Sequence, residues 1–306
     1  IKTTTNLLES RLLVGSKKEF LALKASISSE INQRQFYIQK LQEQNARHKK
    51  FRDSAYQLEP NIKESPGGLR DLHMVLWVAS SQNKGNSFKQ LLANNVIDRE
   101  EFNKVRFHLN RISKRRMLLH LLAGRAEDRL VFDLQNQLAE HLGYQSSGYK
   151  KASELVMKSY YKSVNYIILF NEIMLKKLDP LQHKNTAITH TLPFYEYDNL
   201  LEIDQSYQGN FLKHLFDPFI VFQNNKHLIG FGPNLLGLLD TNSKRINRSI
   251  REDKSTRDNF FTVLNGNNKV NRSLRLLNKC NILGKYIPSF GRVVAQMQHD
   301  LFHIYT

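Results

Sequence analysis

The sequence predicts a mainly α fold: a helical bundle-like region that carries a small β-hairpin. Through most of the chain, apolar residues recur at spacings of three and four, which is the period of an amphipathic helix. Residues 183–207 depart from this period, and short apolar runs on both sides of Asp198-Asn199 favour a hairpin there. The apolar content of 41% is enough for one large or two modest cores, so the composition is that of a folded protein.

The N-terminal residues are interpreted as the end of a preceding domain. The short apolar run Leu12-Leu13-Val14 is followed by Gly15-Ser16 and a helical pattern. Residues 1–25 are therefore expected to form the last strand and helix of a domain whose body precedes Ile1. Residues 26–56 stay helical but polar, which is typical of a helix that covers a surface or crosses between domains.

A turn-rich loop is expected at residues 59–68. Each of its prolines disfavours a helix at the residue before it, and Gly67-Gly68 permits positive φ angles. Apolar residues at helical spacing follow directly, so a helix is expected to begin after the glycines.

Three longer helices are expected further along the chain. Asp98 has Glu101 three residues later, which predicts a capping box at the start of a helix that ends near Gly124. Leucines at every fourth residue predict a second helix over residues 130–142, and a third is expected over residues 149–178.

The sequence supports one internal division, near residues 180–190, because the helical pattern stops before Pro180 and the hairpin pattern follows. Residues 26–182 are expected to form a helical domain. Residues 183–306 are expected to combine the hairpin with a helical linker.

The formal net charge is +17, from 45 Lys and Arg against 28 Asp and Glu. Such a charge attracts phosphates, nucleic acid or an acidic protein partner, and does not choose among them. The densest run, residues 111–116, is interpreted as the solvated face of an amphipathic helix. A basic helical nucleic-acid-binding module stays as an alternative, but the sequence shows no zinc finger, no recognisable helix-turn-helix and no aromatic stacking array. We therefore expect no nucleic-acid partner.

The single cysteine, Cys280, excludes an internal disulfide and a cysteine-based metal site, which fits a reducing cytoplasm. Its apolar neighbours predict a buried small side chain rather than a nucleophile. The apolar stretches are far shorter than the roughly 20 residues of a membrane span, and the chain opens without a signal segment. We expect a soluble, cytoplasmic piece of a longer protein, with no membrane partner.

No catalytic residues are expected within the chain. A nucleotidyltransferase of the polymerase-β type needs a Gly-Ser turn and then two carboxylates two positions apart on one strand, so that both reach Mg²⁺. Gly15-Ser16 has no such pair behind it. The nearest pairs, Glu196 with Asp198 and Glu202 with Asp204, are interpreted as exposed hairpin carboxylates.

No metal-binding residues are expected either. His299-Asp300 is the only His-Asp dipeptide, and it invites comparison with metal phosphohydrolases, in which such a pair ligates a divalent metal. His303 lies four residues beyond His299, but the sequence offers no further ligand cluster around them.

Residues 63–71 are the strongest local candidate for a binding site. Gly67 and Gly68 place backbone N–H groups at a helix N-terminus, where anions are favoured, and Lys63 and Arg70 add positive charge. The alternative is a sharp structural turn without a ligand.

Three phrases of the sequence resemble the PII-protein uridylyltransferase/uridylyl-removing family, in family order. The first is residues 58–72, L-E-P-N-I-K-E-S-P-G-G-L-R-D-L, where Ser65 replaces the usual glycine and leaves the Pro-Gly-Gly turn intact. The second is residues 121–135, L-L-A-G-R-A-E-D-R-L-V-F-D-L-Q. The third is G-K-Y-I-P at residues 284–288, then F-G and Q-M-Q-H-D-L-F-H-I-Y-T at residues 296–306.

The resemblance implies a nucleotidyltransferase domain, a helical region, an HD-type phosphohydrolase domain and two ACT domains. In this family the first domain moves UMP from UTP, with Mg²⁺, onto a tyrosine of the PII signalling protein, and the HD domain removes it when glutamine is abundant. By this match the chain begins after the transferase motifs and stops before the HD ligands. Residues 1–25 would then be the tail of the α/β nucleotidyltransferase domain.

The resemblance also implies a role for the loop of residues 63–71, which would close over the nucleotide from the helical side. The candidate nucleotide-binding residues are Lys63, Gly67, Gly68, Arg70 and Asp71. A related family, the glutamine-synthetase adenylyltransferases, has a similar Gly-Gly-x-Arg-Asp helix start and stays as an alternative, although the lead-in to an HD domain at residues 296–306 argues against it.

Overall fold

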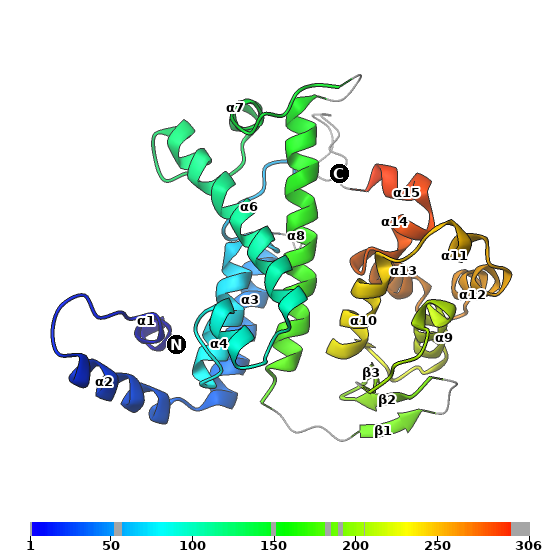
Figure 1. The fold of residues 1–306 in the computed structure, drawn as a ribbon, viewed down its shortest axis with the longest axis horizontal. Helices are drawn as coiled ribbons and strands as arrows, with labels where there is room; N and C mark the ends of the chain where they lie inside the picture. The colour runs from blue at the N-terminus through cyan, green and yellow to red at the C-terminus, as the bar shows by residue number, and fades with distance from the viewer. Residues whose placement is uncertain are drawn as a thin grey trace. The chain divides into compact units, whose positions relative to one another are not determined.

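The computed structural model describes residues 2–51, 57–147, 151–180, 185–188, 192–204 and 206–294. They form two compact units that meet in sequence after Pro180. Helices dominate both units, and a small sheet belongs to the second (Figure 1). The predicted mainly α fold with a small β element is therefore confirmed. No described helix is both long and apolar enough to cross a membrane.

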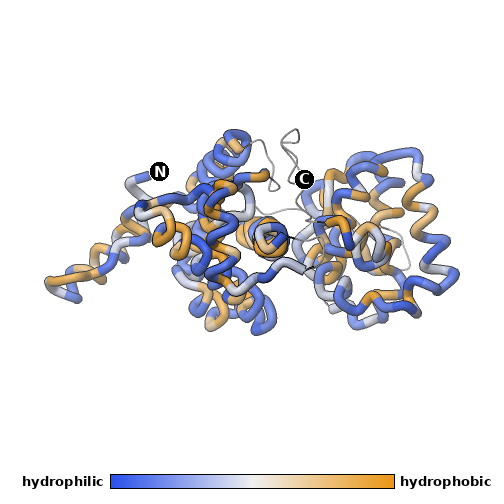
Figure 2. The backbone as a smooth tube through the Cα atoms, turned by 90° about the horizontal axis from the view of Figure 1, so that it is seen from above, coloured by the Kyte–Doolittle hydropathy of each residue, from blue (hydrophilic) through white to orange (hydrophobic). Residues whose placement is uncertain are grey.

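The long helix α8 is the centre of the first unit. The helices α4, α6 and α7 pack against it, and Figure 2, in which α8 is seen nearly end-on, shows apolar positions around this helix. Its side chains Tyr160, Val164 and Met174 are fully buried. The helices of this unit are α1 (Lys2–Leu8), α2 (Lys17–Glu30), α3 (Gln33–Lys50), α4 (Leu69–Ser81), α5 (Phe88–Ala93), α6 (Arg99–Ala123), α7 (Phe132–His141) and α8 (Ala152–Lys177).

The helix boundaries predicted from capping residues are confirmed. Asp98 and Glu101 form a reciprocal capping box at the start of α6, and Gly124 ends that helix with a φ of 63°. The helix α4 begins at Leu69, directly after the two glycines. These signals are local in sequence, which is why they can be read without knowledge of the packing.

Two N-terminal predictions were wrong. Residues 12–14 form no strand: they lie in the bend between α1 and α2, where Leu13 is 77% exposed and Val14 92% exposed. A short apolar run needs a neighbouring strand to pair with, and the described chain provides none there. The polar helix expected from residue 26 onward is two helices, because Asn32 caps a new helix by accepting a hydrogen bond from the Gln35 amide.

The second unit is built on a four-stranded sheet in the order β1 (Asn185–Ile188), β2 (Phe194–Tyr197), β3 (Leu200–Ile203) and β4 (Gly230–Phe231). The first three strands are antiparallel, and β4 runs parallel to β3. Asp198 and Asn199 join β2 to β3 with φ angles of 53° and 58°. Two consecutive positive φ angles are what a two-residue hairpin turn requires, so the predicted hairpin is confirmed, whereas β1 and β4 were not foreseen.

Helices pack around this sheet with an aromatic core. The rings of Phe219 and Phe222 contact Phe231 of β4, and the ring of Phe216 contacts Tyr286. Cys280 is fully buried, as predicted. The helices are η1 (Phe211–His214), α9 (Asp217–Asn224), α10 (Pro233–Ser243), α11 (Arg248–Glu252), α12 (Lys254–Leu264), α13 (Val270–Lys279), α14 (Ile282–Tyr286) and α15 (Pro288–Val293).

Glu202 was wrongly expected to be an exposed hairpin carboxylate. It is 2% exposed, and its carboxylate accepts hydrogen bonds from the Asn234 and Leu235 amides, at 2.9 and 2.6 Å, in the first turn of α10. Those amides have no acceptor within the helix, and the helix dipole favours a negative charge beside them. Its strand neighbours behave differently: Glu196 forms an ion pair with His227 at 2.9 Å, and Asp204 is exposed as predicted.

We predict that Glu202→Ala will destabilise the second unit by about 2–3 kcal/mol, because buried amides lose their acceptor. The matched control is Glu196→Ala in the same hairpin, where the loss of a partly exposed ion pair should cost about 1 kcal/mol or less. Urea unfolding of both variants measures the difference. Equal destabilisation would show that Glu202 does not hold the start of α10.

Candidate functional site

Two loop segments that are remote in sequence lie side by side in the first unit. The Ile62 amide donates a hydrogen bond of 2.7 Å to the carbonyl of Asp128, and the Leu130 amide donates one of 2.9 Å to the carbonyl of Pro60. Between them, Asn61 and Arg129 form an antiparallel bridge. We call residues 58–68 and 124–131 the paired loops. They belong to the first two of the phrases that carry the family resemblance.

Side chains strengthen the pairing at its far end. The Glu59 carboxylate accepts a hydrogen bond of 3.0 Å from the Phe132 amide at the start of α7 and forms an ion pair with Arg129 at 3.0 Å. The buried side-chain amide of Gln135 donates to the carbonyls of Leu58 and Leu130, both at 2.8 Å. One loop therefore fixes the position of the other.

The backbone amides on which the predicted anion site depends already have acceptors. The Gly67 amide donates to the Asp71 carboxylate at 2.7 Å, the Gly68 amide to the Ser65 carbonyl at 2.8 Å, and the Arg70 amide to the Lys63 carbonyl at 2.9 Å. The glycines thus close a tight turn. What remains for a ligand is the side chains of Lys63 and Arg70.

The two glycines allow close contact with α8 and with the loop itself. Gly67 has a φ of +75°, and a Cβ placed on it would lie 2.5 Å from Cγ1 and 2.6 Å from the carbonyl oxygen of Val164. A Cβ on Gly68 would lie 2.7 Å from the carbonyl oxygen of Lys63. No larger residue fits either position without displacement of the backbone.

Asp71 is the buried partner that holds the turn. Its carboxylate is 1% exposed and accepts from Arg47 at 2.6 Å and from His48 at 2.9 Å, both on α3. Asn171 of α8 donates to the Asp71 carbonyl at 2.8 Å. Burial, the largest influence, raises the pKa of Asp71, but the hydrogen bond and charge of His48 and those of Arg47 bring the pKa below its usual value.

Four partly exposed basic side chains surround the paired loops: Lys63, Arg70, Arg116 and His120, which we call the cationic rim. Arg116 and His120 of α6 contact the Asp128 carboxylate at 2.6 and 3.0 Å. Arg70 forms an ion pair with Glu64 at 3.0 Å, and its guanidinium lies 5.4 Å from the ring centre of Trp77.

His73 lies on α4 near this rim, and its environment disfavours the protonated form of its imidazole. Burial and then the charge of Arg70 bring the pKa of His73 below its usual value; Glu9 opposes them, and Lys63 and Arg116 lower the pKa by smaller amounts. His73 is therefore held in its neutral form at neutral pH.

Sequence reasoning missed Arg116, His120 and His73 and interpreted residues 111–116 as a solvated face. The structure corrects this: Arg116 is bound to Asp128, and Arg115 is buried at 4% exposure. The one signal in the sequence for these residues was the acidic Asp128, within the second phrase of the family resemblance (residues 121–135). Its partners on α6 are recognisable only once the two loops are paired.

The arrangement does not fit a metal ion. Among the residues that the structure describes, no three His, Cys, Asp or Glu side chains gather closely enough to hold one. Ser16 caps α2 by accepting from the Glu19 amide at 3.3 Å, so Gly15-Ser16 starts a helix. His299, Asp300 and His303 lie outside the described residues.

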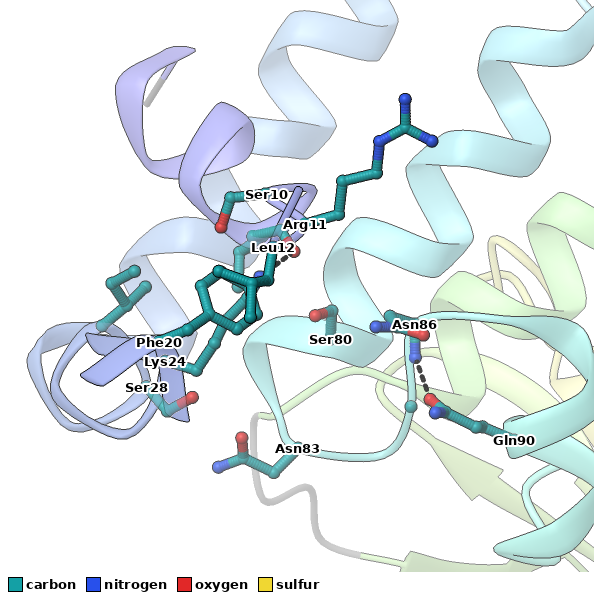
Figure 3. Close-up of a pocket in the computed structure, with 13 residues that line it drawn as sticks. Ser10, Arg11, Leu12, Phe20, Lys24, Ser28, Ser80, Asn83, Asn86 and Gln90 are labelled. Atoms are coloured by element: carbon teal, nitrogen blue, oxygen red, sulfur yellow. Dashed lines mark hydrogen bonds between the residues drawn. The ribbon is translucent and has the colours of Figure 1, made fainter. Parts of the chain in front are cut away.

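A separate pocket of about 440 Å³ lies between α1, α2 and the end of α4 (Figure 3). The Lys24 ammonium in this pocket already has partners, because it donates to the carbonyls of Leu7 and Leu8 at the end of α1, at 3.0 and 2.7 Å. Arg11 points away from Lys24. This pocket lacks the clustered cations of the paired loops.

The fold and the paired loops define a mainly helical protein segment with a cationic rim. Comparisons with known proteins identify which one. The family model described as GlnD PII-uridylyltransferase matches residues 35–175, and the model described as uridylyltransferase GlnD third domain matches residues 194–286. The chain therefore belongs to the GlnD uridylyltransferase family.

Curated relatives match the whole chain. The bifunctional uridylyltransferase/uridylyl-removing enzymes of Ralstonia nicotianae, Cupriavidus metallidurans and Burkholderia lata are 35%, 36% and 35% identical to it, over 100% of this chain and 36% of their own length. The chain thus spans about a third of the length of these relatives. No solved structure matches it.

We predict that Gly67→Ala will destabilise the first unit by about 2–4 kcal/mol, from backbone strain at positive φ and from overlap with Val164. The control is Gly124→Ala, which also has a positive φ of 63° but meets nothing within 4 Å. That variant should lose only the strain, about 1 kcal/mol. Urea unfolding separates the two effects, and equal losses would show that the close contact with α8 is unimportant.

We also predict a pH dependence that comes from His73. Because its folded pKa lies below the ordinary histidine value of 6.5, the unfolded chain binds more protons near that pH, so stability falls as the pH decreases through about 6.5. His73→Gln should flatten the dependence between about pH 5 and 7. Urea unfolding at several pH values tests this, and an unchanged slope in the variant would contradict it.

Proposed function

We propose that the chain is the helical scaffold between the two catalytic domains of an enzyme that transfers UMP from UTP to a tyrosine of the PII signalling protein and removes it again. The observation that carries this is the match of the whole chain to relatives whose printed names state both activities. Both family models are described as uridylyltransferases, which favours uridylyl over adenylyl transfer. We propose that the chain alone is inactive.

The paired loops are the part of this scaffold that we propose to contact the nucleotide. Lys63 and Arg70 would bind the phosphates of UTP, because a triphosphate needs several cations, and these two side chains are about a third exposed. Gly67, Gly68 and Asp71 would act indirectly by holding the turn that presents them. Arg116 would join them from α6.

Two carboxylates that form ion pairs with the cationic rim also fit a role in phosphate binding. Glu64 and Asp128 hold Arg70 and Arg116 in place before a ligand arrives. A charged group that is already oriented loses less conformational entropy on binding than a free one. Partial exposure of these ion pairs leaves their cations able to exchange a carboxylate for a phosphate.

The remaining features of the parent enzyme are also proposals. Mg²⁺ would assist the transfer, with ligands outside this chain. Glutamine would act as the effector, and the protein would work in the cytoplasm.

We predict that UTP changes the fluorescence of Trp77, the only tryptophan, because the Arg70 guanidinium lies over its ring. Titration of the chain with UTP gives the affinity. Lys63→Ala and Arg70→Ala should each weaken binding about tenfold, the equivalent of one lost charge-assisted hydrogen bond. Because Arg70→Ala also alters the reporter, its affinity is confirmed by calorimetry.

The control is Lys114→Ala, which removes one exposed charge from α6 outside the rim. It should bind UTP as the wild type does. In the full-length enzyme, Lys63→Ala and Arg70→Ala should slow UMP transfer to PII while Lys114→Ala does not. Unchanged affinity and turnover in all three variants would leave the loop a structural turn only.

A further inference from the structure

A groove of about 440 Å³ lies between α9 and α12 in the second unit. Side chains at spacings of three and four residues line it from both helices. They are Ile220, Gln223 and Asn224 on α9, and Asp258, Phe261 and Thr262 on α12. Such spacings place side chains on one face of a helix, so one face of each helix contributes to the groove. The turn of residues 265–267 completes the lining.

Gln223 gives this groove one fixed hydrogen-bond acceptor. The residue is 4% exposed, and Nε2 of its amide donates to the carbonyl of Val263 at 2.9 Å and to Oγ of Ser273 at 3.2 Å. A carbonyl oxygen only accepts, so these bonds decide which end of the amide carries the nitrogen. The other end, Oε1, accepts no hydrogen bond from the residues that the structure describes.

Gly266 leaves that oxygen uncovered. A Cβ on Gly266 would collide with Oε1 of Gln223 and would lie 2.8 Å from its Cδ. Oε1 is the atom of Gln223 nearest to that position, so the oxygen faces the turn that lines the groove. Oε1 is also accessible to solvent, although the residue as a whole is buried. The groove therefore presents an acceptor that cannot rotate away.

Other polar side chains of the lining are available to a ligand. Asn224, Asp258 and Asn267 are exposed, and their side chains form no hydrogen bond or ion pair with the described part of the chain. The ring of Phe261 is 57% exposed beside them.

The groove offers no cation to a phosphate. No lysine or arginine lines it. The ammonium of Lys269, at the end of the same turn, already donates to three backbone carbonyls in and after α9. Amides, one carboxylate and an aromatic ring suit a neutral polar ligand with a flat ring.

We propose that the groove binds uridine, with the imide N–H of uracil donating to Oε1 of Gln223. The two carbonyls of the base would accept from the side-chain amides of Asn224 and Asn267, and the ring would lie against Phe261. The ribose hydroxyls would donate to the Asp258 carboxylate. The phosphates of a uridine nucleotide would point away from the groove into solvent.

A fixed acceptor distinguishes uracil from cytosine. The imide nitrogen of uracil carries a hydrogen, whereas the corresponding ring nitrogen of cytosine has a lone pair, which would face the lone pairs of Oε1. Gln223 thus selects an imide. The choice of uridine among imide-bearing ligands rests on the proposed function, in which UMP is the transferred group. The groove shares no residue with the cationic rim.

The test is a titration of the chain with uridine, without UTP or PII, followed by the NMR signals of the ligand. A nucleoside of this size should bind with a Kd of about 0.1–1 mM. Cytidine, and uridine methylated at its imide nitrogen, should bind about tenfold more weakly or not at all, because Oε1 then has no donor. A change in the ligand leaves the fold of the protein untouched.

Variants locate the binding. Phe261→Ala should weaken uridine binding about tenfold, because the base loses its stacking surface. The matched control is Phe290→Ala, which removes a partly exposed ring of α15 outside the groove. Asn267→Ala and Asn268→Ala form a second pair, since both side chains are exposed and only the first lines the groove. Each control should bind as the wild type does.

Lys63→Ala separates this proposal from the proposed function. It should leave the uridine titration unchanged, because neutral uridine has no phosphate for the cationic rim, whatever its effect on UMP transfer. Loss of uridine binding in Lys63→Ala would overturn the proposal. So would the absence of uridine binding, equal binding of uridine and its methylated form, or equal binding by Phe261→Ala and Phe290→Ala.

Discussion

The buried carboxylate of Asp71 is the interaction on which the candidate site depends. It joins three elements, because Arg47 and His48 reach it from α3 and the Gly67 amide from the turn before α4. Its lowered pKa keeps it charged at neutral pH, so the stability that it contributes is present above the ordinary pKa of aspartate and is lost only as the pH falls through the lower folded value. Burial of such a group is tolerated because both of its carboxylate oxygens accept hydrogen bonds.

The position of the second paired loop, residues 124–131, follows from that of residues 58–68. With the turn held against α8, the Ile62 amide and the Pro60 carbonyl are fixed where they can pair with residues 128–130. That pairing brings Asp128 and its partner Arg116 next to Lys63. The cationic rim is thus a product of tertiary pairing between segments nearly seventy residues apart in the chain.

The sequence predicted the local features well and the remote ones poorly. The helix start at Leu69, the capping box of Asp98 and the turn at Asp198-Asn199 depend on neighbouring residues, and all three were predicted. The strand β4, the pairing of the loops and the burial of Glu202 depend on partners more than twenty residues away, which no local pattern encodes. The false strand at residues 12–14 has the same cause: an apolar run is a strand only where a second strand meets it.

The positive charge of the chain illustrates the same limit. Arg115 and Arg116 are adjacent in a run that looks like one solvated basic face, yet one is buried against α8 and the other is paired with Asp128. A net charge of +17 therefore does not describe a single basic surface. Part of it lies inside the first unit, where Arg115 donates to the Ser159 hydroxyl and to the Arg111 carbonyl, and part of it surrounds the paired loops. Arg115 and Arg116 do not belong to one continuous exposed stripe, which a long polyanion would require.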